Sequence, residues 1–370
     1  MRSKTRMRVV RYDEDGLTRF VAQVFTSAGV RDGDADIVAA SLVGADAQGV
    51  RTHGTARIAA YVGQLERGEV EARPVDRVVA RTPGSALLDG GGGLGAPVGA
   101  RAIDMAMALA EGSGIGMVGV RNVAHFGAAG FYARRAARRG FLAVVMSSTS
   151  AVVAPFGGAE ARIGNSPLAI AGPGDGREAA FMLDIAQSVT ARGRVKLALD
   201  AGEPIPKGWA VDSHGQSTTD PDLALRGALL ASGGHKGSGL SIAIEVMAAG
   251  LTGGQLSQDV HHSGFTVSDA SESLTGRDVT VGCLFLAIPA DVFGDGAGVR
   301  RRTERILRHV RQCPPAAGVA RVLAPGDIEA ARAQESQEQG VPVMGSTDDD
   351  LSALAQRYGL TLPTPLNGRG

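Results

Sequence analysis

The chain has 370 residues, 44% of them hydrophobic, and a chain of this length buries a large core and favours division into two subdomains. Lys plus Arg and Asp plus Glu each total 38, so the net charge is zero, which argues against a nucleic acid or an anionic membrane as partner. The two cysteines lack metal-ligand spacing, no apolar signal sequence follows the basic residues 1–11, and no run reaches the roughly 18 apolar residues that span a bilayer, so we expect a globular cytoplasmic protein.

The N-terminal part is predicted to be helical, because its apolar residues recur at helical spacing. Two helices are expected over 13–30 and 32–43. Gly49 then interrupts the pattern, and Thr52 can cap a third helix that runs to Arg67.

His53 and Arg57 are four residues apart and would share one face of this third helix. An imidazole titrates near neutrality and a guanidinium grips carboxylates, so the pair predicts an acid/base group beside a substrate clamp. In the first helical turn, the positive end of the helix dipole would keep the imidazole of His53 neutral. A surface helix that carries an unrelated histidine and arginine is the alternative.

A glycine-rich loop follows in a strand–loop–helix arrangement that invites a dinucleotide-binding interpretation. The strands are expected over 77–80 and 86–88, the loop over 90–95 and the helix over 97–111. Gly93, Gly95 and Gly99 give the spacing GxGxxxG instead of GxGxxG, and no acidic residue ends a second strand at the right distance. We therefore predict that this loop is not a Rossmann turn.

A second histidine, His125, lies in a loop between a predicted strand over 117–120 and a helix over 128–139. A loop histidine in that position can reach a ligand; hydrogen bonding to a nearby carbonyl is the alternative. After a strand over 141–147, Asp184 ends a further apolar strand. Its carboxylate can accept a hydrogen bond from a histidine or a ligand, or it can cap a helix over 189–199.

The last part of the chain offers one more candidate ligand site. Lys236 lies in a glycine loop before a helix over 240–251, where it can hold a phosphate or a ribose hydroxyl, although the GxxxxGK[ST] spacing of a P-loop is missing. His261 and His262 have no acidic or cysteine partner at useful spacing, so we predict no metal ion. Further elements are expected over 279–288 (strand) and over 298–311, 327–339 and 348–358 (helices).

These pieces together resemble the type 2 malate/L-lactate dehydrogenase family, whose relatives include ureidoglycolate dehydrogenase, diketogulonate reductase and piperideine-2-carboxylate reductase. The motifs that carry the resemblance occur in family order: Thr52-His53-Gly54 with Arg57, His125-Phe-Gly127, Pro155-Phe-Gly-Gly158, Gly164-Asn-Ser-Pro167, Leu183-Asp184-Ile-Ala186, Lys236-Gly237 and Pro325-Gly326-Asp327. The resemblance implies an α+β fold with a mixed, largely antiparallel non-Rossmann sheet. It also implies a helical subdomain from 12–70 with 298–362, an NAD(P)-binding sheet domain over 71–297, and a homodimer or larger assembly.

The resemblance further implies roles for single residues. The catalytic group would be His53, Arg57, His125 and Asp184, with the proton carried by either histidine, and Thr52 and Arg57 would contact the substrate. The residues that line the cofactor would be Thr149, Asp184, Ile185, Ala186, Lys236, Gly326 and Asp327. Thr52 replaces the usual serine, and Ser166 and Gln187 depart from the family pattern where ligand contacts are expected, so the substrate stays open.

The implied activity is hydride transfer between NAD or NADP and a small 2-hydroxy or 2-oxo acid. Such chemistry needs a hydride source, a proton donor near the heteroatom and a cation that fixes the carboxylate, and Arg57 with a histidine can supply the last two. The first alternative is a ketimine reductase that acts on a cyclic 2-imino acid. The second is a non-catalytic ligand-binding or assembly protein with the same fold, which Ser166 and Gln187 would mark as drift.

Overall fold

A seven-stranded mixed sheet forms the centre of the computed structural model, which describes residues 8–174, 179–260 and 280–366. In spatial order the strands are β2 (Arg77–Arg81), β3 (Ser85–Gly93), β4 (Gly116–Val123), β11 (Val281–Pro289), β5 (Phe141–Ser147), β6 (Leu168–Pro173) and β7 (Ala179–Ile185). Among the described strands of this sheet, only β3 and β4 pair in parallel, and the helix α4 (Gly95–Ser113) connects them; the other neighbours are antiparallel. The predicted mixed, largely antiparallel sheet is confirmed.

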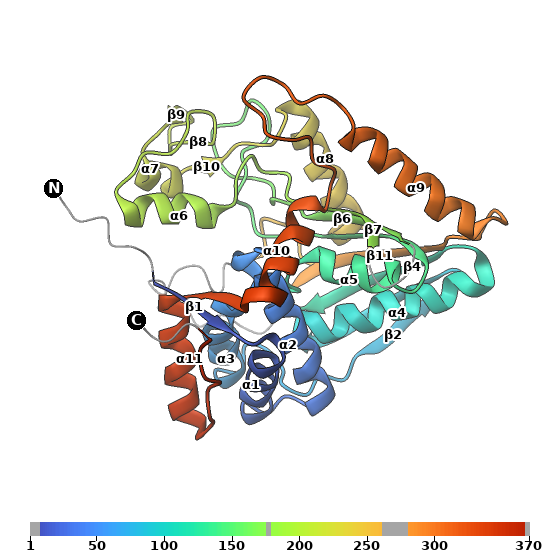
Figure 1. Ribbon diagram of the computed structural model, residues 1–370, viewed down its shortest axis with the longest axis horizontal. Coiled ribbons are helices and arrows are strands. Elements are labelled where there is room, and N and C mark those ends of the chain that lie inside the picture. Colours follow the sequence, from blue (N-terminus) through green and yellow to red (C-terminus); the bar gives the residue numbers. More distant parts are fainter. Residues whose placement is uncertain (1–7, 175–178, 261–279, 367–370) are drawn as a thin grey trace.

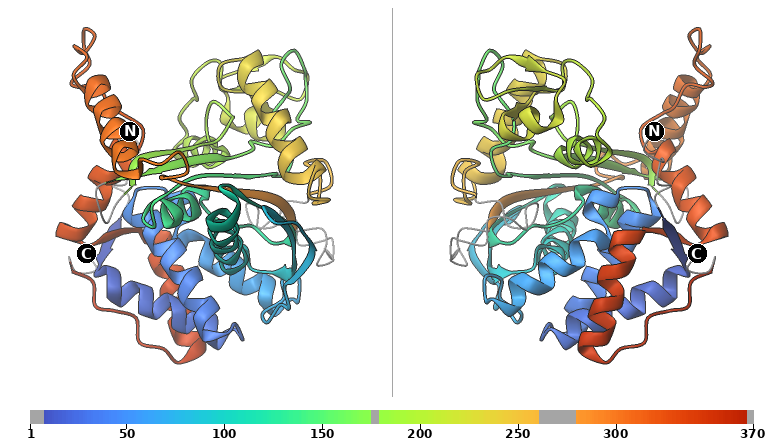
Figure 2. Two further views of the ribbon diagram at one scale, coloured as in Figure 1. Left: turned by 90° about the vertical axis from the view of Figure 1, so that its right-hand side faces the viewer. Right: turned by 90° about the vertical axis from the view of Figure 1, so that its left-hand side faces the viewer.

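Each face of the sheet is covered by helices. On one face α4 and α5 (Ala129–Ala137) present alanines that let both helices approach closely, and they pack with Tyr132, Phe285 and other buried apolar residues of the strands. On the other face lie α8 (His235–Glu245) and its π-helical continuation Val246–Gly250, packed through Ile244 and Ala248. Both views of Figure 2 show the sheet running between these layers.

The N-terminal helices form a further layer together with the C-terminal end of the chain. The N-terminal helices of this layer are α1 (Glu14–Ser27), α2 (Asp32–Ala47) and α3 (Ile58–Glu66), and the C-terminal ones are α10 (Asp327–Gln339) and α11 (Gly345–Tyr358). Two short strands, β1 (Val9–Tyr12) and β12 (Val341–Met344), pair antiparallel and join the chain ends. Sequence reasoning missed these strands, because four residues that pair across more than 300 positions carry no local signal. The helix α9 (Gly296–Arg311) lies against β6 and β7, and the predicted domain division stays a prediction.

A small lobe with its own apolar cluster sits above the sheet in Figure 1. It contains α6 (Arg192–Ala201), α7 (Pro221–Arg226) and the two-residue strands β8 (Ala210–Val211), β9 (Ser217–Thr218) and β10 (Ala228–Leu229). Val153, Val195 and Leu229 are buried in it. The helix predicted over 189–199 begins three residues later, after Ala191. The lobe covers one side of the cavity described below.

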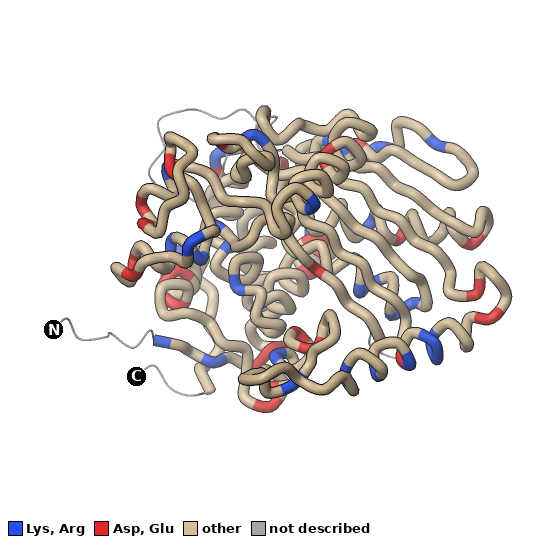
Figure 3. Tube along the Cα trace, turned by 90° about the horizontal axis from the view of Figure 1, so that it is seen from above, with Lys and Arg blue, Asp and Glu red and all other residues tan. Residues whose placement is uncertain are grey.

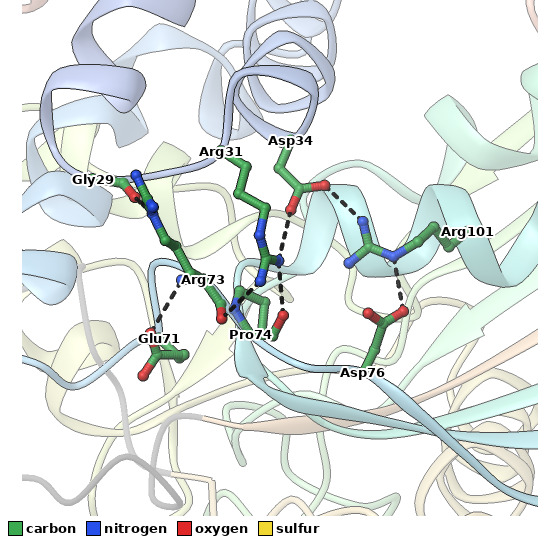
Figure 4. Close-up of polar contacts among 8 residues, drawn as sticks. All are labelled: Gly29, Arg31, Asp34, Glu71, Arg73, Pro74, Asp76 and Arg101. Atoms are coloured by element: carbon green, nitrogen blue, oxygen red, sulfur yellow. Dashed lines mark hydrogen bonds and ion pairs between the residues drawn. The ribbon is translucent and has the colours of Figure 1, made fainter.

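Polar contacts fix the N-terminal helices against α4, as Figure 4 shows. Arg101 of α4 donates from Nη1 to Asp34 of α2 across 2.6 Å and from Nε to Asp76 across 2.8 Å. Arg31 donates from Nη1 to the carbonyl of Pro74 across 2.8 Å. These bonds tie the N-terminal end of α2 to α4 and to the segment that leads into β2. Within the described ranges no helix is both long and apolar enough to cross a bilayer.

Candidate active site

The segment with His53 and Arg57 is not the single helix that was predicted. Residues Arg51–His53 and Thr55–Arg57 form two 3-10 turns, and α3 begins only at Ile58. Thr52 therefore caps no helix, and that prediction is wrong.

The reason for the two turns is the buried carboxylate of Asp46. It accepts hydrogen bonds from the backbone N–H of Thr55 across 2.8 Å and from its hydroxyl across 2.5 Å. A Cβ atom on Gly54 would lie 1.9 Å from Oδ1 of Asp46, so only glycine fits there. Asp46 thus replaces the helical hydrogen bonds that the sequence pattern suggested.

A cavity of about 300 Å³ opens between the N-terminal helices, the ends of β5 and β7, and the small lobe. Seven of the predicted site residues line it: Thr52, His53, Arg57, His125, Thr149, Asp184 and Ala186. Residues that are up to 134 positions apart in the chain therefore meet at one place, as the predicted catalytic group requires.

The two histidines lie together in this cavity. Their rings stack with centroids 5.5 Å apart and an interplanar angle of 20°. Burial, with Arg57 nearby, lowers the pKa of His53 to about 4, and the same causes lower the pKa of His125 well below its usual value. Both rings are therefore neutral at pH 7. The expected neutral form of His53 is present, but burial causes it instead of a helix dipole.

Tyr61 is a functional candidate that sequence reasoning missed. It lies on α3, and its hydroxyl is 2.5 Å from Nδ1 of His125. Burial raises the pKa of Tyr61 to about 12, so the hydroxyl keeps its proton and can donate a hydrogen bond to Nδ1. The proton of neutral His125 is then on Nε2. The signal was available, because Tyr61 follows Arg57 by four residues, as Arg57 follows His53.

Arg57 lies beside both histidines and is 6% exposed. Its Nε donates to the carbonyl of Thr52 across 2.7 Å, which fixes the direction of the guanidinium plane. Burial lowers the pKa of Arg57, but an arginine keeps its charge in proteins. A buried, oriented guanidinium suits a bidentate contact with a carboxylate.

Asp184 lies at the end of β7, as predicted, and accepts a hydrogen bond from the backbone N–H of Gly130 in α5 across 2.8 Å. The alternative, a cap on the helix that follows it, is not observed. Burial raises the pKa of Asp184 to about 6. The hydrogen bond from Gly130 and the charge of Arg134 lower this pKa, and the charge of Glu329 raises it.

The two residues that depart from the family pattern, Ser166 and Gln187, are chain neighbours of residues that line the cavity. Ser166 is buried and accepts a hydrogen bond from Ser241 across 2.9 Å, so its hydroxyl has a structural partner. The side-chain Nε2 of Gln187 is buried and has no partner among the described residues.

Four predicted cofactor residues do not line the cavity. Lys236 is exposed at the start of α8, and Ile185 is 41% exposed at the end of β7. Gly326 packs on Met182, and Asp327 forms an ion pair with Arg311 across 2.6 Å. Their contact with the coenzyme stays a prediction.

The donor set of the cavity fits a nicotinamide. A carboxamide needs an acceptor for its NH2 group, and Asp184 has a carboxylate oxygen that makes no hydrogen bond to the described residues. Thr149 and the serines beside it add hydroxyls; Thr149 donates its own proton to Asn165 across 2.8 Å. The glycine loop before α4, which was predicted not to be a Rossmann turn, does not line this cavity. A Cβ atom on Gly95 would lie 2.3 Å from the Cα of Phe126, so this glycine packs against the loop that carries His125.

Metal ligands are not grouped in the part of the chain that the structure describes, where no three His, Cys, Asp or Glu residues come together. His261 and His262 lie outside the described residues. Figure 3 shows Lys and Arg positions interspersed with Asp and Glu positions along the trace.

The buried arginine can hold the carboxylate of a substrate, and the neutral imidazoles beside it can exchange a proton with that substrate. An NAD(P)-dependent oxidoreductase of small 2-hydroxy acids requires both functions. Comparison with known proteins supports this class. The chain belongs to the malate/L-lactate dehydrogenase family, whose model matches residues 12–352.

Relatives of known identity match over nearly the whole chain. Malate dehydrogenase from Pyrococcus abyssi is 32% identical over 359 residues, which cover 95% of this chain and 96% of the relative. The structure of sulfolactate dehydrogenase from Methanocaldococcus jannaschii superposes with a TM-score of 0.86 at 32% identity, covering 96% of this chain and 98% of that one. The structure of delta1-piperideine-2-carboxylate reductase from Pseudomonas syringae has a TM-score of 0.80 at 29% identity, covering 93% and 99%.

Proposed function

We propose that this chain interconverts a small 2-oxo acid and the matching 2-hydroxy acid, with NAD or NADP as the coenzyme. The observation that carries the proposal is the meeting of Arg57 with the His53 and His125 imidazoles in one buried cavity. In the direction of reduction, a hydride adds to C2 of the oxo acid and a proton adds to its oxygen. The reverse reaction returns both.

Each of these residues has a distinct task in the proposed mechanism. Arg57 binds the carboxylate through two parallel hydrogen bonds and so directs C2. His125 donates the proton from Nε2 to the developing alkoxide while its Nδ1 takes the proton of the Tyr61 hydroxyl, so the ring stays neutral and the Tyr61 phenolate then regains a proton from solvent. When bound, the nicotinamide supplies the hydride. Asp184 and Thr149 would hold its carboxamide.

His53 has a supporting role in this proposal. Its Nδ1 lies 3.0 Å from the hydroxyl of Thr52, and its ring stacks on His125. This contact keeps the His125 ring in one orientation and excludes water from one side of it. The proton can also pass through His53, and the paired variants described in the Discussion separate the two assignments.

The test is a coenzyme-coupled absorbance assay over a panel of 2-oxo acids, with NADH and NADPH in parallel. Arg57→Lys is expected to lower kcat/KM by roughly 100-fold, because a point charge cannot replace the two-pronged contact. The matched control is Arg51→Lys, six residues upstream and exposed, which should change kcat/KM by less than about threefold. A wild type that reduces no 2-oxo acid, or an unchanged Arg57→Lys, would contradict the proposal.

Ketimine reduction is the second candidate, favoured by the likeness to the piperideine-2-carboxylate reductase structure. A cyclic 2-imino acid that is already protonated on nitrogen needs a hydride but no proton donor. Replacing His125 by Gln should therefore spare ketimine reduction and abolish 2-oxo acid reduction. Piperideine-2-carboxylate belongs in the same assay panel for this reason. Self-association and cytoplasmic location stay predictions, and light scattering on the purified chain would measure the first.

A further inference from the structure

A further arginine, Arg192, lines the cavity from the small lobe. Arg192 is the first residue of α6 in the small lobe, and it lines the cavity together with Gly193. A Cβ atom on Gly193 would lie 3.2 Å from Cγ2 of Thr52, so the start of α6 rests directly on the turn that carries His53. Arg57 lines the cavity from the turn before α3 and Arg192 lines it from the start of α6, a helix that lies above α2 and α3 in Figure 1.

The charge of Arg192 is not balanced by protein carboxylates in the part of the chain that the structure describes. The Nη2 group of Arg192 donates to the carbonyl of Leu225 across 2.8 Å, and its other N–H groups have no partner among the described residues. The side chain is half-buried, and burial lowers its pKa. A partly desolvated guanidinium without a counter-ion is costly unless a ligand supplies the negative charge.

Arg134, Asp184 and Glu329 form a separate charged group in the cavity. Arg134 acts on Asp184, where it lowers the pKa of that carboxyl, and Glu329 acts on the same carboxyl from α10. These residues lie on the α5 and α10 side, which holds the proposed nicotinamide contacts. The start of α6, which carries Arg192, lies instead against the His53 turn through Gly193, where the substrate is expected.

We infer that Arg192 binds a second anionic group of the substrate, so that the chain prefers a 2-oxo acid that carries a further carboxylate or sulfonate over a monoanion such as pyruvate. This inference rests on the proposed function and deepens it. Arg57 fixes the carboxylate beside C2, and Arg192 fixes the far end of the molecule. Two anchors at opposite ends orient a short substrate fully, since one anchor leaves rotation about its axis.

The test compares kcat/KM for oxaloacetate and 3-sulfopyruvate with that for 2-oxobutyrate and pyruvate, at saturating coenzyme. The wild type is expected to favour the dianions at least tenfold. Arg192→Met should lower kcat/KM for the dianions by about 10- to 100-fold, mainly through KM, and change the monoanions by less than about threefold. Arg192→Lys should restore part of the loss, because the charge remains.

Two controls keep the result interpretable. Arg194→Met removes an exposed arginine two residues away and should change nothing, and thermal unfolding of Arg192→Met checks that the small lobe stays folded. The inference would be overturned by equal losses for both substrate classes, or by a wild type that uses 2-oxobutyrate as well as oxaloacetate. A weaker Kd for NADH or NADPH in Arg192→Met would also overturn it, because that result would assign Arg192 to a coenzyme phosphate. A wild type inactive on every 2-oxo acid would instead contradict the proposed function, and the inference with it.

Discussion

The hydroxyl oxygen of Tyr61 lies 2.5 Å from Nδ1 of His125, within hydrogen-bonding distance. Removing it leaves both tautomers of His125 accessible, and only one of them carries the proton on Nε2. Tyr61→Phe is therefore expected to lower kcat by about 10- to 100-fold with little change in KM, and to alter the pH profile of kcat. Tyr358→Phe, which removes an exposed hydroxyl that donates to Glu66, is the matched control. An unchanged kcat and pH profile would show that Tyr61 is only a packing residue.

Substitution of each histidine separates their roles. His125→Gln should lower kcat by roughly 100-fold or more, because the proton donor is lost. His53→Ala should reduce turnover less, by about tenfold, and leave coenzyme binding nearly intact. Steady-state kinetics and NADH titration measure both effects. Unchanged turnover in His53→Ala would show that His53 is misassigned, and a larger loss there than in His125→Gln would move the proton to His53.

Coenzyme affinity should depend on the ionisation of Asp184. Burial raises the pKa of Asp184 to about 6, and the ionised carboxylate is the stronger acceptor for a carboxamide NH2. The affinity for NADH should therefore rise as the pH increases through about 6, and Asp184→Asn should remove most of this dependence. Fluorescence titrations at pH 5 and pH 7.5 provide the measurement. The expectation fails if the variant and the wild type show the same pH dependence.

The close approach of Gly54 to Asp46 makes Gly54→Ala strongly destabilising. The new Cβ atom would lie 1.9 Å from Oδ1 of Asp46, so the two turns must shift or the bonds to Thr55 must break. We expect a loss of more than about 2 kcal/mol in the free energy of unfolding, measured by urea denaturation. Gly68→Ala, where nothing lies within 4 Å, is a comparison that tests the backbone effect of a positive φ alone. A loss below that of Gly68→Ala would contradict the steric account.

Asp46 should also make stability depend on pH. Burial raises its pKa from 3.8 to about 6 in the folded chain, with the Thr55 bonds opposing. Between about pH 4 and pH 6 the folded state holds more protons than the unfolded state, so stability falls as the pH rises through this window and levels off above it. Asp46→Asn keeps an acceptor for Thr55 and should shrink the fall by up to about 2–3 kcal/mol. Urea unfolding at both ends of the window measures this, with exposed Asp36→Asn as the control; equal falls in all three proteins would exclude Asp46 as the cause.

Much of the fold follows from local patterns that the sequence displays. Apolar periodicity located most of the helices, and the helix over 327–339 has the predicted ends because Gly326 and Gly340 flank it. The ordered motifs identified the family, and with it the mixed sheet and the cavity lining around His53, Arg57, His125 and Asp184. Helix-forming periodicity and short motifs are readable without structure because they depend on neighbours within a few residues.

Other features were decided by the tertiary structure alone. The His53 segment became two 3-10 turns because Asp46, nine residues before Thr55, is buried beneath it. Tyr61 reaches His125 across 64 positions, and Arg192 reaches the cavity from a separate lobe. Burial sets the protonation of both histidines and of Asp184. Burial and contacts between distant residues exist only once the chain has packed, so the amino-acid pattern determined which groups are present, and the packing determined which of them meet and in what charge state.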